Sequence, residues 1–542
     1  MAGTTPPPGM PGPPRGSADP GYWPVGSQPP YRPRRVSHRG LKILALSVVL
    51  TVMLGGGAFA FYEANPFQIF RAGPQAAEAL PGNAVLYAGI DLNPTAAQKI
   101  DALRFLGHFP AFRDTSGITN PNTDIREILV EKALGSAHCS GLSYTHDVQP
   151  WLGERFGLAV MPHVAHQTEP FAYALQVGDE NAARQGVHAL EACQGTGSGG
   201  SAGLAGMAFA NGYLLLAHTQ AQADAYAKSA ANHSLADNAE FKADTGSLGD
   251  PGVITTWVDV GGAVAAIAGA SVPAAELHAV TSATTRIAAT FRFASDHVEV
   301  ATSIYGDTQP LAIGDNPIVN LPSSTVFALS ESGGDQRIAD IWKHSLAKAR
   351  SQSPGIDQQI SLFEAQTGFR LPGDIETLFG QNILLALDNK GLNATALGSG
   401  DPSQLNYGIR ITNDPAKLDA LYNRLVHAIN VNFGADLPLS KRDFPNGIAV
   451  ATNGAYANKL GALDGNLGET DAFKSVVNDG ADQEFVLFFN FDAVKAQIIQ
   501  SMSRGGAPQQ AIDNVQPLKA FGVAAHVDGH YQHVTLRLSV DS

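Results

Sequence analysis

Apolar positions follow two patterns along this chain, and the change between them divides it. Residues 43–61 form a run of 19 residues without a charge. As a helix this run is about 28 Å long, which matches the hydrocarbon core of a bilayer. Beyond it, apolar residues occur in short stretches separated by Gly, Pro, Asn and Asp, as is typical of strands and turns. The pattern therefore predicts a membrane segment followed by a large globular part.

We expect the membrane segment to be one transmembrane helix over residues 41–62. The basic residues of the first 61 all precede the apolar run, so the positive-inside rule places the N-terminus in the cytoplasm and everything after residue 62 outside the cell. A cleaved signal is the alternative, because Ala58-Phe59-Ala60 fits a cleavage site and Arg34-Arg35 fits a twin-arginine signal. The long apolar run and the long leading segment favour the anchor.

Residues 1–40 form a tail rich in Pro and Gly. Eleven of the 33 prolines lie before residue 34, and the tail has almost no side chains to bury. Such a composition cannot offset the entropy lost on folding. We expect a disordered cytoplasmic tail.

The globular part contains an internal repeat. The stretch "DVQPWLGERFGLAVMP" at 147–162 returns as "DIETLFGQNILLALDN" at 374–389. Six further matches lie in the same order: 80–89 with 321–330, 171–183 with 405–417, 225–227 with 455–457, 241–242 with 473–474, 255–260 with 487–491, and 297–298 with 533–534. Colinear matches at similar offsets indicate tandem duplication, with repeat 1 at 78–307, repeat 2 at 319–542 and a linker near 308–318.

Both repeats show the same series of elements. Predicted strands lie at 84–92, 253–260, 325–330 and 485–491, with helical stretches between strand pairs. Asn211-Gly212 and Asn446-Gly447 are typical of two-residue hairpin turns. Gly153 and Gly380 are expected at the turn into the repeated strand, where freedom in φ is useful. Helices that interrupt hairpins predict an α+β fold with largely antiparallel sheets.

Charge excludes one class of function. Residues 1–61 hold six of the 35 basic residues and one of the 49 acids, so the remainder carries 29 bases against 48 acids. An acidic body repels phosphate backbones at long range, which argues against nucleic-acid binding.

The two cysteines, Cys139 and Cys193, both lie in repeat 1 and have no counterparts in repeat 2. In an extracytoplasmic protein this favours a disulfide between them. Two unpaired buried thiols are the alternative.

Several motifs fit catalytic or metal sites only formally. Ser345-Leu346-Ala347-Lys348 matches Ser-x-x-Lys without the motifs that accompany it in acyl-transfer enzymes, and Gly199–Gly203 fits the nucleophile elbow inside a Gly-rich loop. His163 with His166, and His530 with His533, offer two imidazoles each, whereas zinc needs three or four ligands. The sequence therefore predicts no catalytic residue, no metal site and no cofactor.

The tail, the apolar run, "ALPGNAVLYAGIDLNPTAAQKIDALRFLGHFPAFRD" and "WLGERFGLAV" together resemble a family of actinobacterial proteins, domain of unknown function three-three-five-two. The resemblance implies a membrane-tethered extracytoplasmic protein and no established activity. We expect a binding or structural protein of the cell envelope, with an envelope protein or a lipid as partner. An apolar-ligand carrier and a hydrolase with an unrecognised site are the alternatives.

Overall fold

One antiparallel sheet connects the parts of the chain that the structure describes. The structure is a computed structural model, and it describes residues 75–92, 96–115, 124–136, 139, 141–162, 170–194, 206–268, 285–306, 310–311, 313–353, 355–392, 404–433 and 439–541. The predicted membrane helix at 41–62 and the tail at 1–40 lie outside these residues. None of the described helices has the length and apolar character needed to cross a membrane.

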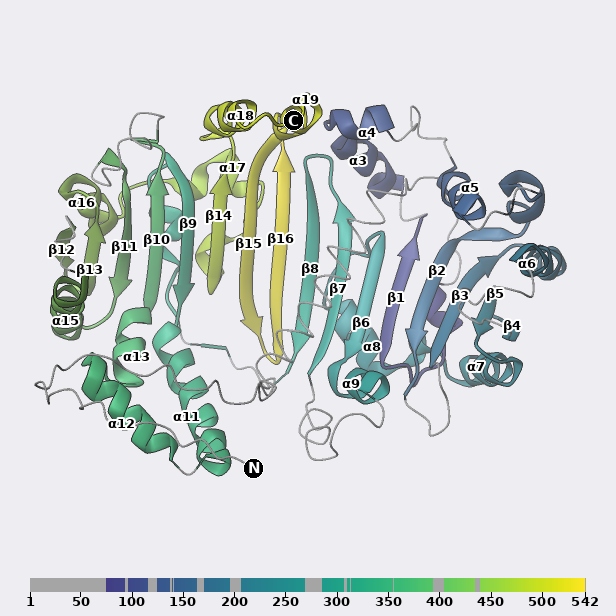
Figure 1. Ribbon diagram of the computed structural model, residues 1–542, viewed down its shortest axis with the longest axis horizontal. Helices are drawn as coiled ribbons and strands as arrows, with labels where there is room; N and C mark the ends of the chain where they lie inside the picture. The colour runs from purple at the N-terminus through teal and green to yellow at the C-terminus, as the bar shows by residue number, and fades with distance from the viewer. Residues whose placement is uncertain are drawn as a thin grey trace, which may run out of the picture. The chain divides into compact units, whose positions relative to one another are not determined.

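The first half contributes eight strands to the sheet (Figure 1). They are β1 Leu86–Asp91, β2 Leu152–Val160, β3 Phe171–Val177, β4 Gly206–Ala210, β5 Tyr213–Ala217, β6 Ile254–Asp259, β7 Arg286–Phe293 and β8 His297–Tyr305. The helices between them are η2 Ala76–Glu78, α3 Ala96–Gly107, α4 Pro110–Thr115, α5 Ile125–Ser136, the π-helical turn η3 Tyr144–Val148, α6 Glu180–Gln194, α7 Gln220–Asn232, η4 Leu235–Asp237, α8 Ala239–Gly246 and α9 Val260–Ala268.

The second half contributes another eight strands. They are β9 Thr325–Ser332, β10 Asn382–Asp388, β11 Tyr407–Thr412, β12 Ser440–Phe444, β13 Gly447–Ala451, β14 Phe485–Asn490, β15 Leu518–Asp528 and β16 Tyr531–Val540. The helices are η6 Pro317–Asn320, α11 Gly334–Gln352, α12 Ile356–Thr367, α13 Gly373–Phe379, α15 Pro415–Phe433, α16 Gly454–Ala462, η8 Leu467–Glu469, α17 Asp471–Lys474, η9 Gly480–Asp482, α18 Lys495–Arg504 and α19 Gln509–Val515.

The order of strands in the sheet is β12-β13-β11-β10-β9-β14-β15-β16-β8-β7-β6-β1-β2-β3-β5-β4. Read outward from its centre, the first eight strands and the last eight follow the same order. The halves meet where β16 pairs with β8, over nine residue pairs from Tyr531 opposite Tyr305 to Ser539 opposite His297. The α+β class with antiparallel pairing is confirmed.

Each half has an apolar core on the same face of the sheet. In the first half Tyr87, Ala159 and Trp257 pack against η2, α7 and α8. In the second half Ala328, Ala386 and Phe488 pack against η6, α16 and α17. Since neighbours along a strand point to opposite faces, the residues between them lie on the other face. We call these the core face and the open face of the sheet.

The structure confirms one of the two expected Asn-Gly turns and one of the two glycines expected at the turn into the repeated strand. Asn211 and Gly212 have φ of 51° and 81° and close the β4–β5 hairpin as expected. The β12–β13 hairpin also forms, but Gly447 already belongs to β13, so Pro445 and Asn446 make the turn. Gly380 precedes β10 with φ of 58°, whereas Gly153 lies inside β2 and has no positive φ.

Candidate functional site

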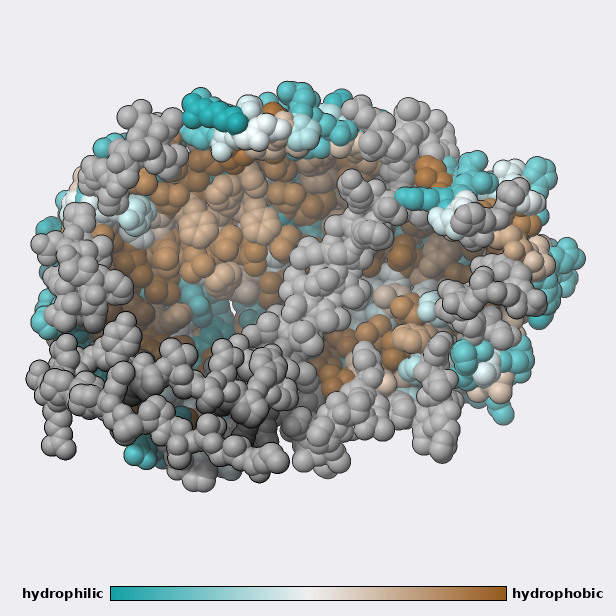
Figure 2. Space-filling model, viewed as in Figure 1, coloured by the Kyte–Doolittle hydropathy of each residue, from teal (hydrophilic) through white to brown (hydrophobic). Residues whose placement is uncertain are grey.

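The open face carries apolar side chains that no described helix buries. Figure 2 shows brown, apolar surface gathered over β9, β10, β14, β15 and β16, where the molecule is hollowed. Two rows of side chains cross six neighbouring strands there: Leu385, Leu329, Leu487, Val523, Leu536 and Val300 form one, and Leu387, Phe327, Phe489, Phe521, Leu538 and Val298 form the other. Leu385 is exposed and the other eleven are partly exposed, and Val298, at the end of its row, also contacts the apolar cluster of α3. We call these twelve side chains the apolar basin.

The sheet register explains the two rows. Leu487 lies opposite Leu329 and Val523, and Leu536 lies opposite Val523 and Val300, so side chains of one parity line up across the strands. Five strand spacings make the basin about 24 Å wide. Because the row crosses from β16 into β8, both halves contribute to it. Soluble monomers rarely expose a continuous apolar surface of this size without a use for it.

Helices cover the open face beside the basin. Phe105 of α3 packs against Phe291 and Phe293 of β7, and Leu418 of α15 packs against Ile411 and Ile448. The basin is therefore the part of this face that lies between helical covers.

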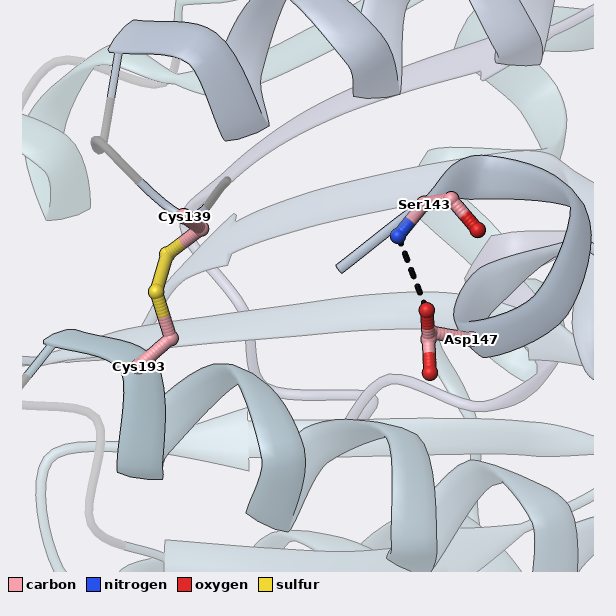
Figure 3. Close-up of a disulfide and its surroundings, with 4 residues drawn as sticks. All are labelled: Cys139, Ser143, Asp147 and Cys193. Atoms are coloured by element: carbon pink, nitrogen blue, oxygen red, sulfur yellow. Dashed lines mark hydrogen bonds between the residues drawn. A yellow bond between two sulfur atoms is a disulfide. The ribbon is translucent and has the colours of Figure 1, made fainter. Parts of the chain in front are cut away.

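A disulfide anchors another helix, α6, that covers the open face. Cys139, after α5, is bonded to Cys193 in α6, with the two Cα atoms 5.6 Å apart (Figure 3). Close by, the Ser143 N–H donates to the Asp147 carboxylate at 2.8 Å and fixes the turn that leads into β2. Since α6 packs over Leu214 and Leu175, the bond holds this helix on the sheet.

A cluster of ionisable side chains lies where α3 and α5 meet β2. The Arg126 guanidinium pairs with Asp124 at 2.8 Å, and Tyr144 donates its hydroxyl to the same carboxylate at 2.5 Å. Burial raises the pKa of Glu154 to about 7, and the charge of Arg126 opposes that rise only in part. Burial also lowers the pKa of Lys99. Groups with displaced pKa values are common at functional sites but also occur in structural networks.

Glu154→Gln is expected to stabilise the protein above pH 7 and to have little effect near pH 4. The folded pKa of about 7 exceeds the usual 4.5, so the folded state binds the proton more tightly and stability falls as pH rises between these values. After allowance for solvent screening, the gain at pH 8 should be about 1–2 kcal/mol. Urea unfolding at pH 4 and pH 8 measures it. Glu127→Gln, at an exposed position of α5, is the control, and an equal gain at both pH values would contradict the prediction.

The motifs noted in the sequence do not come together. Ser345 is exposed on α11, His530 is exposed in the turn before β16, and His533 points to the core face with Nδ1 3.0 Å from the Ser303 hydroxyl. Gly199–Gly203, His163 and His166 lie outside the described residues. Within the described ranges, no three His, Cys, Asp or Glu side chains are grouped as metal ligands.

Sequence reasoning missed two features of the sheet. The basin depends on register between distant strands, which no single strand reveals. Arg155 and Glu299 are buried charges on the core face. In β2 the adjacent Glu154 and Arg155 interrupt the apolar run, whereas Glu299 lies between Val298 and Val300 in regular alternation and its burial has no local signal.

Comparison with known proteins identifies the family of the chain but no relative of known function. No curated protein and no solved structure matches it. A family model matches residues 43–398, which is more than half of the chain and includes all of the first eight strands. The chain therefore belongs to the family described as protein of unknown function (DUF3352).

Proposed function

We propose that this protein is a membrane-tethered, extracytoplasmic binding protein of the cell envelope, and that the acyl chains of lipids occupy its apolar basin. It acts by binding and not by catalysis. The observation that carries the proposal is the basin itself: two rows, each of six partly or fully exposed apolar side chains, lie side by side on one face of the sheet. The uncharged run at residues 43–61 supports the tether.

The chemistry of the basin favours acyl chains over a protein partner. The strands that form its floor already pair their backbone groups with each other, and the two rows contain no polar side chain. Protein interfaces typically form about one hydrogen bond per 100–200 Å², which this floor cannot supply. An acyl chain needs none, and its length is about half the roughly 30 Å hydrocarbon core, so it fits within the basin. Among the hypotheses from the sequence, the geometry thus favours the apolar-ligand carrier.

Tandem duplication is part of this proposal. The repeated strand order around the β8–β16 pair and the colinear sequence matches support it. Each copy would supply half of a continuous sheet. A basin that crosses from β16 into β8 would then be a product of joining the copies.

The test is photolabelling in intact protoplasts that produce the full chain. A photoactivatable fatty acid is added, the cells are illuminated, and protease is then applied from outside. We expect the protease to release labelled fragments, with the label on peptides from β9, β14 and β15. Leu385→Glu, at a basin position that is 38% exposed, is expected to reduce the label at least fivefold, because a bound acyl chain would cover the new carboxylate and remove it from water.

Leu362→Glu is the matched control. Leu362 is 54% exposed on α12, outside the basin, so the same substitution there should leave the label unchanged. Failure of the protease to reach the chain would refute the extracytoplasmic location. Release of fragments without label, or crosslinks to a protein at the basin in its place, would refute the acyl ligand.

A further inference from the structure

A cavity lies on the core face of the first half, on the side of the sheet opposite the basin. Its volume is about 600 Å³, which is in the usual range for small-molecule sites. The 3-10 turn η2 and helix α8 form two walls, and β1, β6 and β7 form the floor. Ala76, Ala77, Phe241 and Leu248 make most of the lining apolar.

Two small residues form part of the cavity floor. Gly89 and Thr255 lie opposite each other on β1 and β6, and both line the cavity. The Tyr87 side chain extends along the strand, so that a Cβ at Gly89 would come within 2.1 Å of its hydroxyl oxygen. The floor at Gly89 therefore cannot carry a side chain while Tyr87 keeps its place.

A buried ion pair forms one end of the cavity. Arg155 Nε donates to Asp91 Oδ2 at 2.9 Å, and the two side chains are only 7% and 14% exposed. Gln75 Nε2 also donates to Asp91 Oδ2, at 3.3 Å. All three residues line the cavity.

In the second half, the two positions that correspond to Asp91 and Arg155 are neutral, although the neighbouring buried Glu484 pairs with Arg337 at 2.6 Å. Asp91 and Arg155 face each other on β1 and β2, and Ser332 and Asn382 face each other on the corresponding β9 and β10. There Asn382 Nδ2 donates to the Ser332 and Ser330 hydroxyls at 3.1 and 2.9 Å. Since burying an ion pair has a desolvation penalty that a neutral pair avoids, packing alone does not require the charges in the first half.

We propose that this cavity binds a small neutral molecule with an apolar body and one hydroxyl or amide group, which meets the Arg155–Asp91 pair. A neutral group that both donates and accepts hydrogen bonds matches a guanidinium beside a carboxylate. Three acids and two bases line the cavity, so a carboxylate or an ammonium group would meet a like charge as well as an opposite one, whereas a neutral group meets no like charge; these residues are Glu78, Asp91, Asp250, Arg155 and Lys242. The apolar lining holds the body of the molecule.

The test compares three probes of one shape: 2-naphthol, naphthalene and 2-naphthoate. Each is added to the full chain in lipid nanodiscs at pH 7, and saturation-transfer NMR measures binding. Thr255→Phe fills the cavity floor, so the signal that remains in this variant reports partition into lipid. We expect 2-naphthol to bind the wild type at least tenfold more tightly than Thr255→Phe, and more tightly than the other two probes.

Two further variants decide the result. Thr256→Phe places the same side chain one residue along, on the open face, and should bind 2-naphthol like the wild type. Asp91→Ser with Arg155→Asn copies the second half and should lower the preference for 2-naphthol over naphthalene, because a neutral pair binds the hydroxyl more weakly than a charged pair. Equal binding by wild type and Thr255→Phe would refute the site, and tighter binding of 2-naphthoate would refute the neutral ligand.

Discussion

Glu299→Gln should destabilise the protein by about 3–5 kcal/mol, since it breaks a buried charge network where the two halves meet. Glu299 is 6% exposed on β8. Its Oε1 accepts from Arg292 Nε at 2.5 Å, and its Oε2 accepts from Arg537 Nε at 2.6 Å. Arg292 lies on β7 and Arg537 on β16, so the carboxylate joins the strand pair of one half to the last strand of the other. If Glu299 loses its charge, the guanidinium groups of Arg292 and Arg537 remain largely buried without a carboxylate between them.

The same network gives a pH dependence with a definite sign. Burial alone would raise the pKa of Glu299, but the charges of Arg292 and Arg537 outweigh it and hold the pKa below the usual 4.5. The unfolded state therefore binds the proton more readily, and this contribution is present above about pH 4.5 and is lost as pH falls below it. Glu299→Gln should remove that part of the acid sensitivity.

Urea unfolding at pH 7 and pH 4 measures both effects. Asp357→Asn is the control, because it breaks the exposed Arg350–Asp357 pair, whose side chains are 57% and 59% exposed. Exposed pairs contribute little, so this variant should unfold like the wild type. If Glu299→Gln also unfolds like the wild type at pH 7, the network does not hold the halves together.

The sequence predicts the elements of this fold that depend on nearby residues, and it does not predict contacts between residues far apart in the chain. Strands β1, β6, β9 and β14 lie within one or two residues of the predicted ranges, because period-2 alternation is a local signal. The pairing of β16 with β8 was not predicted. Both strands belong to long hairpins with one unpaired edge, and nothing within either hairpin specifies which strand lies beside it.

Strand register also limits what the sequence repeat can predict about the faces of the sheet. The sequence match aligned Thr255 with Leu487, but the pairings show a shift of one residue: Tyr87 lies opposite Trp257, and Ala328 lies opposite Phe488. Trp257 therefore corresponds to Phe488, and Leu487 belongs to the open face. A slip of one residue exchanges the faces of a strand, so the basin could not be read from the alignment.

The candidate sites also differ in whether a local feature of the sequence predicts them. Cys139 and Cys193 were paired from composition and compartment, and the structure contains their disulfide. Arg155 was visible only as a charge within "GERFGLAV", and its partner Asp91 lies 64 residues earlier. A contact over that distance depends on the sheet and has no local signal.

Loss of the disulfide should destabilise the protein by about 4 kcal/mol. The bond joins residues 54 apart, and on the chain-entropy model a closed loop of this length restricts the unfolded chain by about that amount. Cys139→Ala with Cys193→Ala is the variant, and urea unfolding of the protein without reductant is the measurement. The wild type in reductant should unfold like the variant without reductant.

Loss of the disulfide should destabilise the first half of the sheet more than the second half. The closed loop contains η3, β2, β3 and most of α6, and Trp151 packs in the cluster that these elements form. Trp342 lies on α11 in the second half, outside the loop. Two variants each keep one tryptophan, Trp151 or Trp342, with the others replaced by Phe. When the bond is lost, the urea midpoint of the unfolding transition reported by Trp151 fluorescence should fall by more than the midpoint reported by Trp342. Equal shifts would show that the sheet unfolds as one unit. Mass spectrometry showing both thiols free in the non-reduced protein would refute the disulfide itself.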